Sequence, residues 1–283
     1  MEFIKIILFR VAKKWIAGES LSDVIKRTKE VNQKDMHAII NFLGEHVKSK
    51  KQAENNVEEY FKILESIRGG KLNASISLKL TEIDLDVDEK ICYRNLLRLV
   101  RKANQNKIFV WIDMEESKYT QITIDFYLKL LNFSKNVGIS IQSNLKRSKD
   151  DVERILAKNG IIRLTKGAYK ENSRTAFQDI EQINENFSKI MKMLFEKSEF
   201  FAIATHDDKL VQETLKLRLK YSKNVEFQFL KGIRDDLKVK LAQRGFDVAE
   251  YIPYGTDWLA YGLRRLQERR RNFLLLFRSL IRI

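Results

Sequence analysis

Residues 75–113, SISLKLTEIDLDVDEKICYRNLLRLVRKANQNKIFVWID, decide the fold class because two short apolar runs flank one helical stretch. The runs at 75–80 and 108–113 are nearly continuous, as is typical of parallel strands covered by helices. Between them, one stripe at helical spacing carries apolar side chains, namely Ile91, Leu96, Leu99 and Val100. The stretch therefore predicts a strand, a connecting helix and a second strand.

The same alternation continues along the chain. Further apolar runs bring the number of expected strands to eight: 37–45, 138–142, 160–165, 200–205, 225–230 and 249–253. The helical candidates are 55–68, 90–104, 174–197 and 209–221. Eight strands alternating with helices fit a closed barrel or a doubly wound sheet, and the count of eight favours an α/β (β/α)8 TIM-type barrel.

The chain has 283 residues, and one such barrel typically needs about 250. We therefore expect a single domain over residues 1–283. Its barrel spans about 35–272, an N-terminal helical segment covers 1–34, and an apolar cationic tail covers 273–283. The segments at 3–15 and 273–283 (FLLLFRSLIRI) combine apolar residues with Lys or Arg. They either dock on the barrel or contact a membrane or partner, so peripheral membrane contact through 273–283 stays open.

The net charge is +15, from 53 basic and 38 acidic residues. Such a surface attracts polyanions, anionic membranes or acidic small molecules. The basic residues are scattered, without a stripe of interleaved aromatics, so we expect a solvated Lys-rich surface and no nucleic-acid partner. Cys92 is the sole cysteine, which excludes an intrachain disulfide and suits a cytoplasmic location. No signal peptide or membrane-spanning run is evident.

Polar residues stand where the apolar runs stop, and chemistry in such barrels lies at the carboxyl ends of the strands. These residues are Lys79, Asp113, Gln142, Arg163, Thr205, His206, Gln228 and Tyr251. A polar group inside a strand is costly to bury without a partner. The pattern thus predicts either a functional site at one mouth of the barrel or interior ion pairs, such as Lys79 with Asp113.

Two further features could bind an anion. Lys166-Gly167-Ala168 follows the strand at 160–165, and a glycine there lets backbone N–H groups approach a phosphate or a ring. Arg264 and Arg265 lie on a helical stretch at 258–271, where they either clamp a carboxylate or phosphate or form a solvated face. Dinucleotide-binding, P-loop and serine-hydrolase motifs are absent. No metal site is expected, because the histidines are widely spaced, without an H-E-x-x-H motif or a cysteine partner: His37, His46 and His206.

Together these segments resemble the proline dehydrogenase family. The motifs are SLKL, VWIDMEES, RLTKGAY, ATHD, EFQFLKGI and YIPYGTDWLAYGLRRLQER, in the family's order and spacing from about 15 to 272. The resemblance implies a distorted barrel that holds FAD non-covalently. It also implies oxidation of L-proline to 1-pyrroline-5-carboxylate by hydride transfer to flavin N5, the first step of proline catabolism. A second, aldehyde-oxidising domain, which some relatives carry, is not expected.

The resemblance also implies roles for individual residues. Asp113 and Arg163 would be the catalytic residues, with Asp113 holding the basic groups in place and Arg163 lying against flavin N5. The proline carboxylate would bind Arg264, Arg265 and Lys79, and Glu268 would pair with the arginine helix. The ring would be walled by Tyr251, Leu230, Ala168 and Tyr169. The cofactor would contact Met114, Gln142, Arg163, Lys166, Gly167, Ala168, Thr205 and His206.

Three departures from the family pattern concern loop gating and affinity: Lys170-Glu171 where an aromatic is frequent, Asp207 in ATHD where Asn is common, and Asn41 where Asp is frequent. The electron acceptor, a quinone or a carrier protein, is left open. Two rival hypotheses remain. A barrel enzyme that binds a phosphorylated small molecule would hold no flavin, whereas a basic non-enzymatic binding protein would bind DNA with steep salt dependence.

Overall fold

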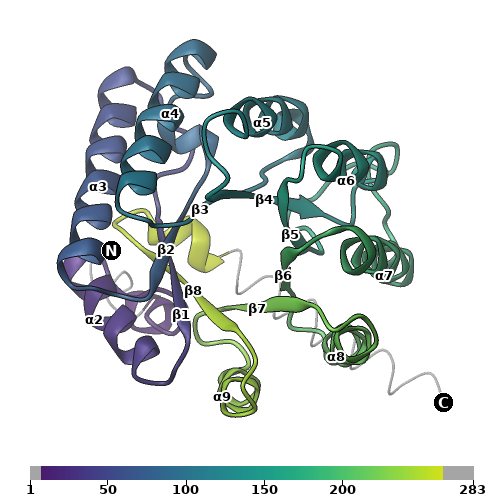
Figure 1. Cartoon of the computed structure of the whole chain (residues 1–283). Coiled ribbons are helices and arrows are strands. Elements are labelled where there is room, and N and C mark those ends of the chain that lie inside the picture. The colour runs from purple at the N-terminus through teal and green to yellow at the C-terminus, as the bar shows by residue number, and fades with distance from the viewer. Residues whose placement is uncertain (1–7, 264–283) are drawn as a thin grey trace.

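In the computed structural model, which describes residues 8–263, eight parallel strands close a barrel in chain order (Figure 1). The strands are β1 (His37–Phe42), β2 (Ala74–Leu78), β3 (Val110–Ile112), β4 (Val137–Gln142), β5 (Ile161–Thr165), β6 (Phe200–Ala204), β7 (Asn224–Leu230) and β8 (Val248–Tyr254). The ring closes between β1 and β8, where Ile39 pairs with Tyr251. The prediction of a (β/α)8 barrel is therefore confirmed.

The helices form an outer ring around the strands (Figure 1). They are α2 (Leu21–Asn32), α3 (Lys50–Gly69), α4 (Glu89–Gln105), α5 (Ser117–Leu130), α6 (Ser148–Leu156), α7 (Ile180–Lys197), α8 (Asp208–Tyr221) and α9 (Asp235–Gln243). Each turns an apolar stripe to the sheet. In α4 that stripe carries the predicted Leu96, Leu99 and Val100, which are all buried together with Cys92. Burial of such stripes supplies most of the helical stability.

Two helices begin several residues away from their predicted starts, for local reasons. The helix predicted at 174–197 begins at Ile180. Asn172 Oδ1 accepts the N–H groups of Arg174 and Thr175, at 3.0 and 3.1 Å, which holds a turn there instead. The helix predicted at 55–68 begins earlier, at Lys50, because Ser49 Oγ accepts the N–H of Gln52 and caps it.

The barrel interior is layered by the two-residue period of its strands. One apolar layer contains Ile39, Trp111 and Ala249, all almost fully buried. The Trp111 ring fills the space beside Gly138, where a Cβ atom would lie only 2.5 Å from it. Two residues further along the same strands come Asn41, Asp113 and Tyr251. The polar layer thus rests directly on an apolar floor, on the carboxyl side of the barrel.

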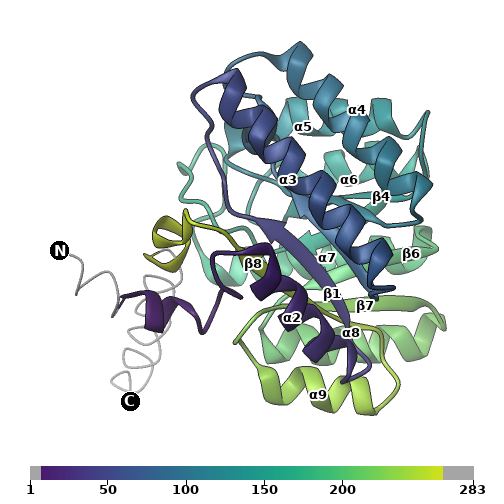
Figure 2. The ribbon, with the colours of Figure 1, turned by 90° about the vertical axis from the view of Figure 1, so that its left-hand side faces the viewer.

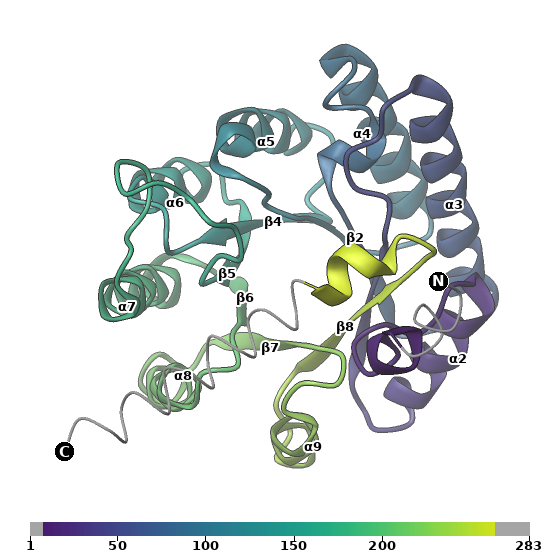
Figure 3. The same ribbon diagram turned by 180° about the vertical axis from the view of Figure 1, so that it is seen from behind.

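The two ends of the described chain lie side by side, as Figures 2 and 3 show for the first helical turns and the helical turn after β8. Their contacts form a small apolar cluster of Ala12, Trp15, Ile16, Leu43, Trp258 and Tyr261. Residues 258–263 are helical, as predicted for 258–271. The other residues of that predicted stretch, 264–271, and the predicted tail at 273–283 lie outside the described residues. Between residues 8 and 263, the helices are too short or too polar to cross a bilayer.

Candidate active site

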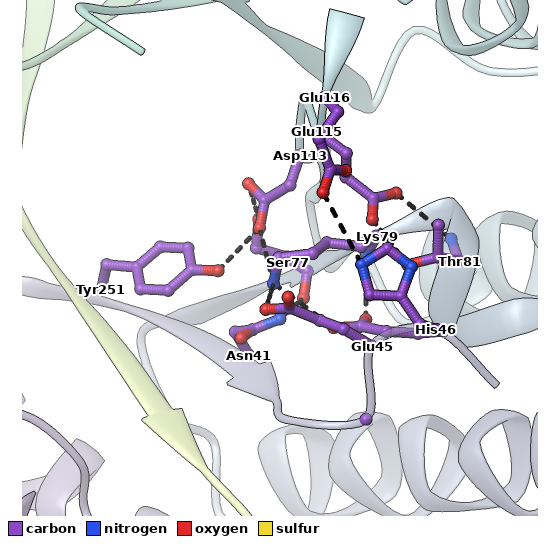
Figure 4. A network of polar contacts seen from close by, with 12 residues as sticks. Asn41, Glu45, His46, Ser77, Lys79, Thr81, Asp113, Glu115, Glu116 and Tyr251 are labelled. Carbon is purple, nitrogen blue, oxygen red and sulfur yellow. Dashed lines mark hydrogen bonds and ion pairs between the residues drawn. The ribbon is translucent and has the colours of Figure 1, made fainter. Parts of the chain in front are cut away.

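Asp113, at the carboxyl end of β3, is the centre of the polar layer (Figure 4). Its Oδ1 accepts hydrogen bonds from the Arg163 guanidinium and from Ser77 Oγ, the latter at 2.9 Å. Its Oδ2 accepts the Tyr251 hydroxyl at 2.6 Å and lies 3.8 Å from Lys79 Nζ. The structure thus brings four of the predicted site residues, from β2, β3, β5 and β8, into one contact network.

Arg163 is 3% exposed, so its charge must be fully paired inside the barrel. Besides Asp113, its Nε donates to Ser140 Oγ at 2.7 Å, and its Nη1 donates to Gln228 Oε1 at 3.3 Å. The guanidinium carbon lies 5.0 Å from the centroid of the Trp111 ring. These contacts fix the orientation of the cation before any ligand binds.

Lys79 Nζ lies among three carboxylates: Glu45 at 3.3 Å, Glu82 at 3.4 Å and Asp113 at 3.8 Å. Burial alone would lower the pKa of Lys79. The acidic neighbours Tyr251, Glu82, Glu45 and Asp113 outweigh it and raise the pKa of the ammonium well above its ordinary value. The side chain therefore stays charged at neutral pH and presents a permanent cation at the barrel mouth.

The predicted cofactor residues line the neighbouring strand ends. Gln142 ends β4, Lys166 follows β5, and Thr205 and His206 follow β6. Lys166 Nζ pairs with Asp207 at 2.6 Å, and Thr205 Oγ1 accepts the Asp207 N–H at 3.3 Å. The pairings of β4 with β5 and of β5 with β6 place these ends next to one another. They form an edge that continues the Asp113 network around the barrel.

The remaining candidates lie at the same mouth, with different exposure. His206 Nε2 accepts the Leu230 N–H at 3.1 Å, and Leu230 pairs in register with Tyr251, so these three residues are brought together. Met114 is buried, whereas Ala168 is exposed. Arg264, Arg265 and Glu268 lie outside the described residues.

The loop after β5 has the properties of a ligand cradle. Gly167 has a φ of +102°, and a Cβ atom there would lie 2.2 Å from Asn144 Oδ1. That oxygen is buried and has no hydrogen-bond partner among the described residues. The loop thus combines a backbone position without a side chain, the Asn144 acceptor and, nearby in the chain, Arg163 and Lys166. This set of donors and acceptors fits a flavin.

Glu115, two residues after Asp113, is a second buried carboxyl group beside the site (Figure 4). Its oxygens accept the Thr81 N–H at 3.2 Å and the Thr81 hydroxyl at 2.5 Å. With His46 and Glu116 it forms a group whose ligand atoms lie within 4.8 Å of one another. Thr81 already occupies both Glu115 oxygens, and His46 Nδ1 faces Asp86 at 3.1 Å. Two of the three side chains in this group therefore already have hydrogen-bond partners within the protein.

The pKa of Glu115 is raised from 4.5 to about 8, mainly by burial. A raised folded pKa means that folding favours the protonated form. This contribution to stability is therefore present at acid pH and is lost as pH rises through about 8.

Glu115→Gln carries no titrating proton and can still exchange two hydrogen bonds with Thr81. We expect the variant to melt a few degrees above the wild type at about pH 9 but not at about pH 5. Thermal melts at both pH values measure the difference, and equal melting shifts would contradict it.

Several participating residues were missed by the sequence analysis. Ser77 and Ser140 hold Asp113 and Arg163, and Glu82 holds Lys79. The two serines could have been predicted from the two-residue period of the strands. Ser77 lies two residues before Lys79 and Ser140 two before Gln142, on the same inward side of each strand. Glu82 had none, since the stretch TEIDLDVDE has the composition of a solvated turn.

A closed (β/α)8 barrel with a buried, preorganised charge network at the carboxyl ends of its strands is the architecture of a barrel enzyme. The sequence model of proline dehydrogenase matches residues 24–273. The chain therefore belongs to the proline dehydrogenase family and is an oxidoreductase of that family.

The relatives agree with this assignment. The chain is 33% identical to proline dehydrogenase 2 of Bacillus subtilis (strain 168), over 95% of this chain and 90% of that one. It is 27% identical to proline dehydrogenase of Deinococcus radiodurans, over 97% and 91%. Among solved structures, proline utilization A from Bdellovibrio bacteriovorus superposes with a TM-score of 0.87 at 23% identity. That match covers 94% of this chain and 33% of the larger protein, and it supports the fold.

Proposed function

We propose that the protein oxidises L-proline to 1-pyrroline-5-carboxylate with non-covalently bound FAD. The observation that carries the proposal is the network of Lys79, Asp113, Arg163 and Tyr251 at the barrel mouth, in a chain that belongs to this family. A small amino acid needs a fixed cation for its carboxylate and an apolar wall for its ring. Lys79 supplies the first, and Tyr251 with Leu230 supplies the second.

Each residue of the network has a separate task. Lys79, together with Arg264 and Arg265, binds the carboxylate, and Ala168 closes the wall around the ring. Asp113 fixes the direction of Lys79, Arg163 and the Tyr251 hydroxyl. Bound FAD would supply the acceptor for the hydride of the ring carbon next to nitrogen, and Arg163 would provide a positive charge there that favours the reduced state.

The cofactor contacts in this proposal come from four strand ends. They are Met114, Gln142, Arg163, Lys166, Gly167, Ala168, Thr205 and His206. The Asn144 oxygen beside Gly167, which has no hydrogen-bond partner within residues 8–263, supports this placement. We place the enzyme in the cytoplasm, with a quinone or a carrier protein as electron acceptor and with residues 273–283 as the segment that would reach a membrane.

The visible absorption spectrum tests the proposal. We expect the purified protein to be yellow, to release FAD on heating, and to lose its flavin absorbance when L-proline is added without air. Mass analysis of the released compound distinguishes FAD from FMN and from nicotinamide cofactors. A protein that stays colourless after reconstitution with FAD would refute the proposal and favour a barrel enzyme for a phosphorylated substrate.

A further inference from the structure

Glu82 is a fully buried carboxyl group directly behind Lys79, in the short 3-10 turn Leu80–Ile83 that follows β2. Its Oε1 lies 3.4 Å from Lys79 Nζ. Its Oε2 accepts the Lys79 N–H at 2.9 Å and the Tyr60 hydroxyl at 2.7 Å. One side chain therefore holds both the backbone and the ammonium of Lys79.

Tyr60, from α3, can form a hydrogen bond with Glu82 whether the Glu82 carboxyl group is ionised or protonated. Its hydroxyl has one hydrogen and two acceptors in reach: Glu82 Oε2 at 2.7 Å and the carbonyl oxygen of Ser77 at 3.0 Å. When Glu82 is ionised, Tyr60 donates to it. When Glu82 Oε2 carries a proton, Tyr60 can donate to Ser77 and accept from Glu82. Both states are hydrogen-bonded without movement of any heavy atom.

Burial and the groups around Glu82 set the pKa of its carboxyl group near neutral pH. Burial raises its pKa from 4.5 to about 7, against the lowering effects of Lys79 and of the Tyr60 hydrogen bond. The other groups that face it are Glu45, which raises its pKa further, and Glu115, whose own proton affinity the Glu82 charge increases. Glu82 is thus close to half protonated near neutral pH.

We propose that Glu82 is a positioning residue for Lys79 and that it takes up one proton from solvent when a substrate carboxylate binds at Lys79 Nζ. This inference rests on the proposed role of Lys79 in binding the carboxylate. An incoming carboxylate competes with Glu82 for the same ammonium and adds a negative charge a few ångströms away. Both effects favour the neutral form of Glu82, and Tyr60 provides the hydrogen bond that this form requires.

Proton uptake makes carboxylate binding depend on pH. Affinity must increase as pH falls toward about 7, by up to about tenfold per pH unit while the linked proton is taken up, and it must level off below that pH. Glu82→Gln fixes the neutral state, and its amide oxygen still accepts the Lys79 N–H. We therefore expect the variant to bind a carboxylate with an affinity independent of this titration. At about pH 8 its KM for L-proline should be severalfold lower than that of the wild type, with kcat within about twofold.

The test uses tetrahydrofuran-2-carboxylate, a proline isostere whose ring oxygen carries no titrating proton. Its dissociation constant for the full-length, flavin-loaded protein is measured from about pH 6 to about pH 8.5 by the change in flavin absorbance. Calorimetry at about pH 7.5, in two buffers of different ionisation enthalpy, counts the protons taken up. We expect uptake by the wild type and none by Glu82→Gln.

Glu115→Gln is the matched control, because Glu115 is also buried and has a raised pKa but is not among the carboxylates that pair with Lys79 Nζ, which are Glu45, Glu82 and Asp113. It should keep the proton uptake. The inference is overturned by a wild type that takes up no proton, by a Glu82→Gln variant that keeps the wild-type slope, or by loss of the slope in Glu115→Gln. None of these results affects the proposed function, which fails instead if the wild type holds no flavin or if L-proline does not reduce it.

Discussion

Asp113→Asn is expected to lower kcat/KM for L-proline by about 100- to 1000-fold, which corresponds to about 3–4 kcal/mol. The carboxylate is the shared partner of Arg163, Lys79, Ser77 and Tyr251. An amide of the same size accepts through one oxygen only and carries no charge. Two buried cations therefore lose their common counter-charge, and their side chains reorient away from the positions in which substrate and cofactor meet them.

Steady-state kinetics with L-proline and a soluble acceptor measure the loss, and a thermal melt separates it from unfolding. Asp151→Asn on the outer helix α6 is the matched control. Asp151 is also buried and pairs with an arginine, Arg147, at 2.7 Å, but it takes no part in the Asp113 network. It should lose thermal stability and keep its kcat/KM. If Asp113→Asn behaves in the same way, the network is only a structural ion cluster.

The strands could be predicted well from the sequence, because their apolar runs are ended or interrupted by polar residues that belong to the site. Asp113 ends the run FVWID, and in the structure it lies one residue beyond β3 and faces the interior. Arg163 interrupts the run IIRLT, and its cost of burial is offset by partners on three other strands and by Asp113 just beyond β3. A strand's two-residue period and the position of its carboxyl end suffice to predict such positions.

The carboxyl groups behind the site could not be predicted in the same way. Glu82 and Glu115 are ordinary surface residues by composition, and their burial results from contacts that join distant parts of the chain. Tyr60 reaches Glu82 from α3, across 22 positions, and Thr81 reaches Glu115 across 34. No local periodicity encodes these pairings. The first residues of the helix predicted at 174–197 are not helical for a related reason, since a single Asn172 side chain stabilises a competing turn.

Arg163→Lys is expected to weaken FAD binding by about 10- to 100-fold, or about 1.4–3 kcal/mol, and to slow reduction of the bound flavin. The guanidinium meets Asp113, Ser140 and Gln228 with separate N–H groups in one plane and lies over the Trp111 ring. An ammonium group has three donors at one point and cannot reach these acceptors together. The charge is retained, but its position beside the proposed flavin site is no longer fixed.

Titration of the flavin-free protein with FAD, followed by quenching of flavin fluorescence, measures the affinity, and stopped-flow absorbance with L-proline measures the reduction rate. Arg147→Lys is the control, because Arg147 also uses two nitrogens on one carboxylate, Asp151, at 2.7 and 2.8 Å. That change removes an equivalent fork outside the network, so FAD affinity should stay within about twofold of the wild type. Unchanged affinity and unchanged reduction in Arg163→Lys would show that the arginine only fills the barrel. Loss in both would show that its fixed orientation serves the cofactor, because charge alone survives the substitution.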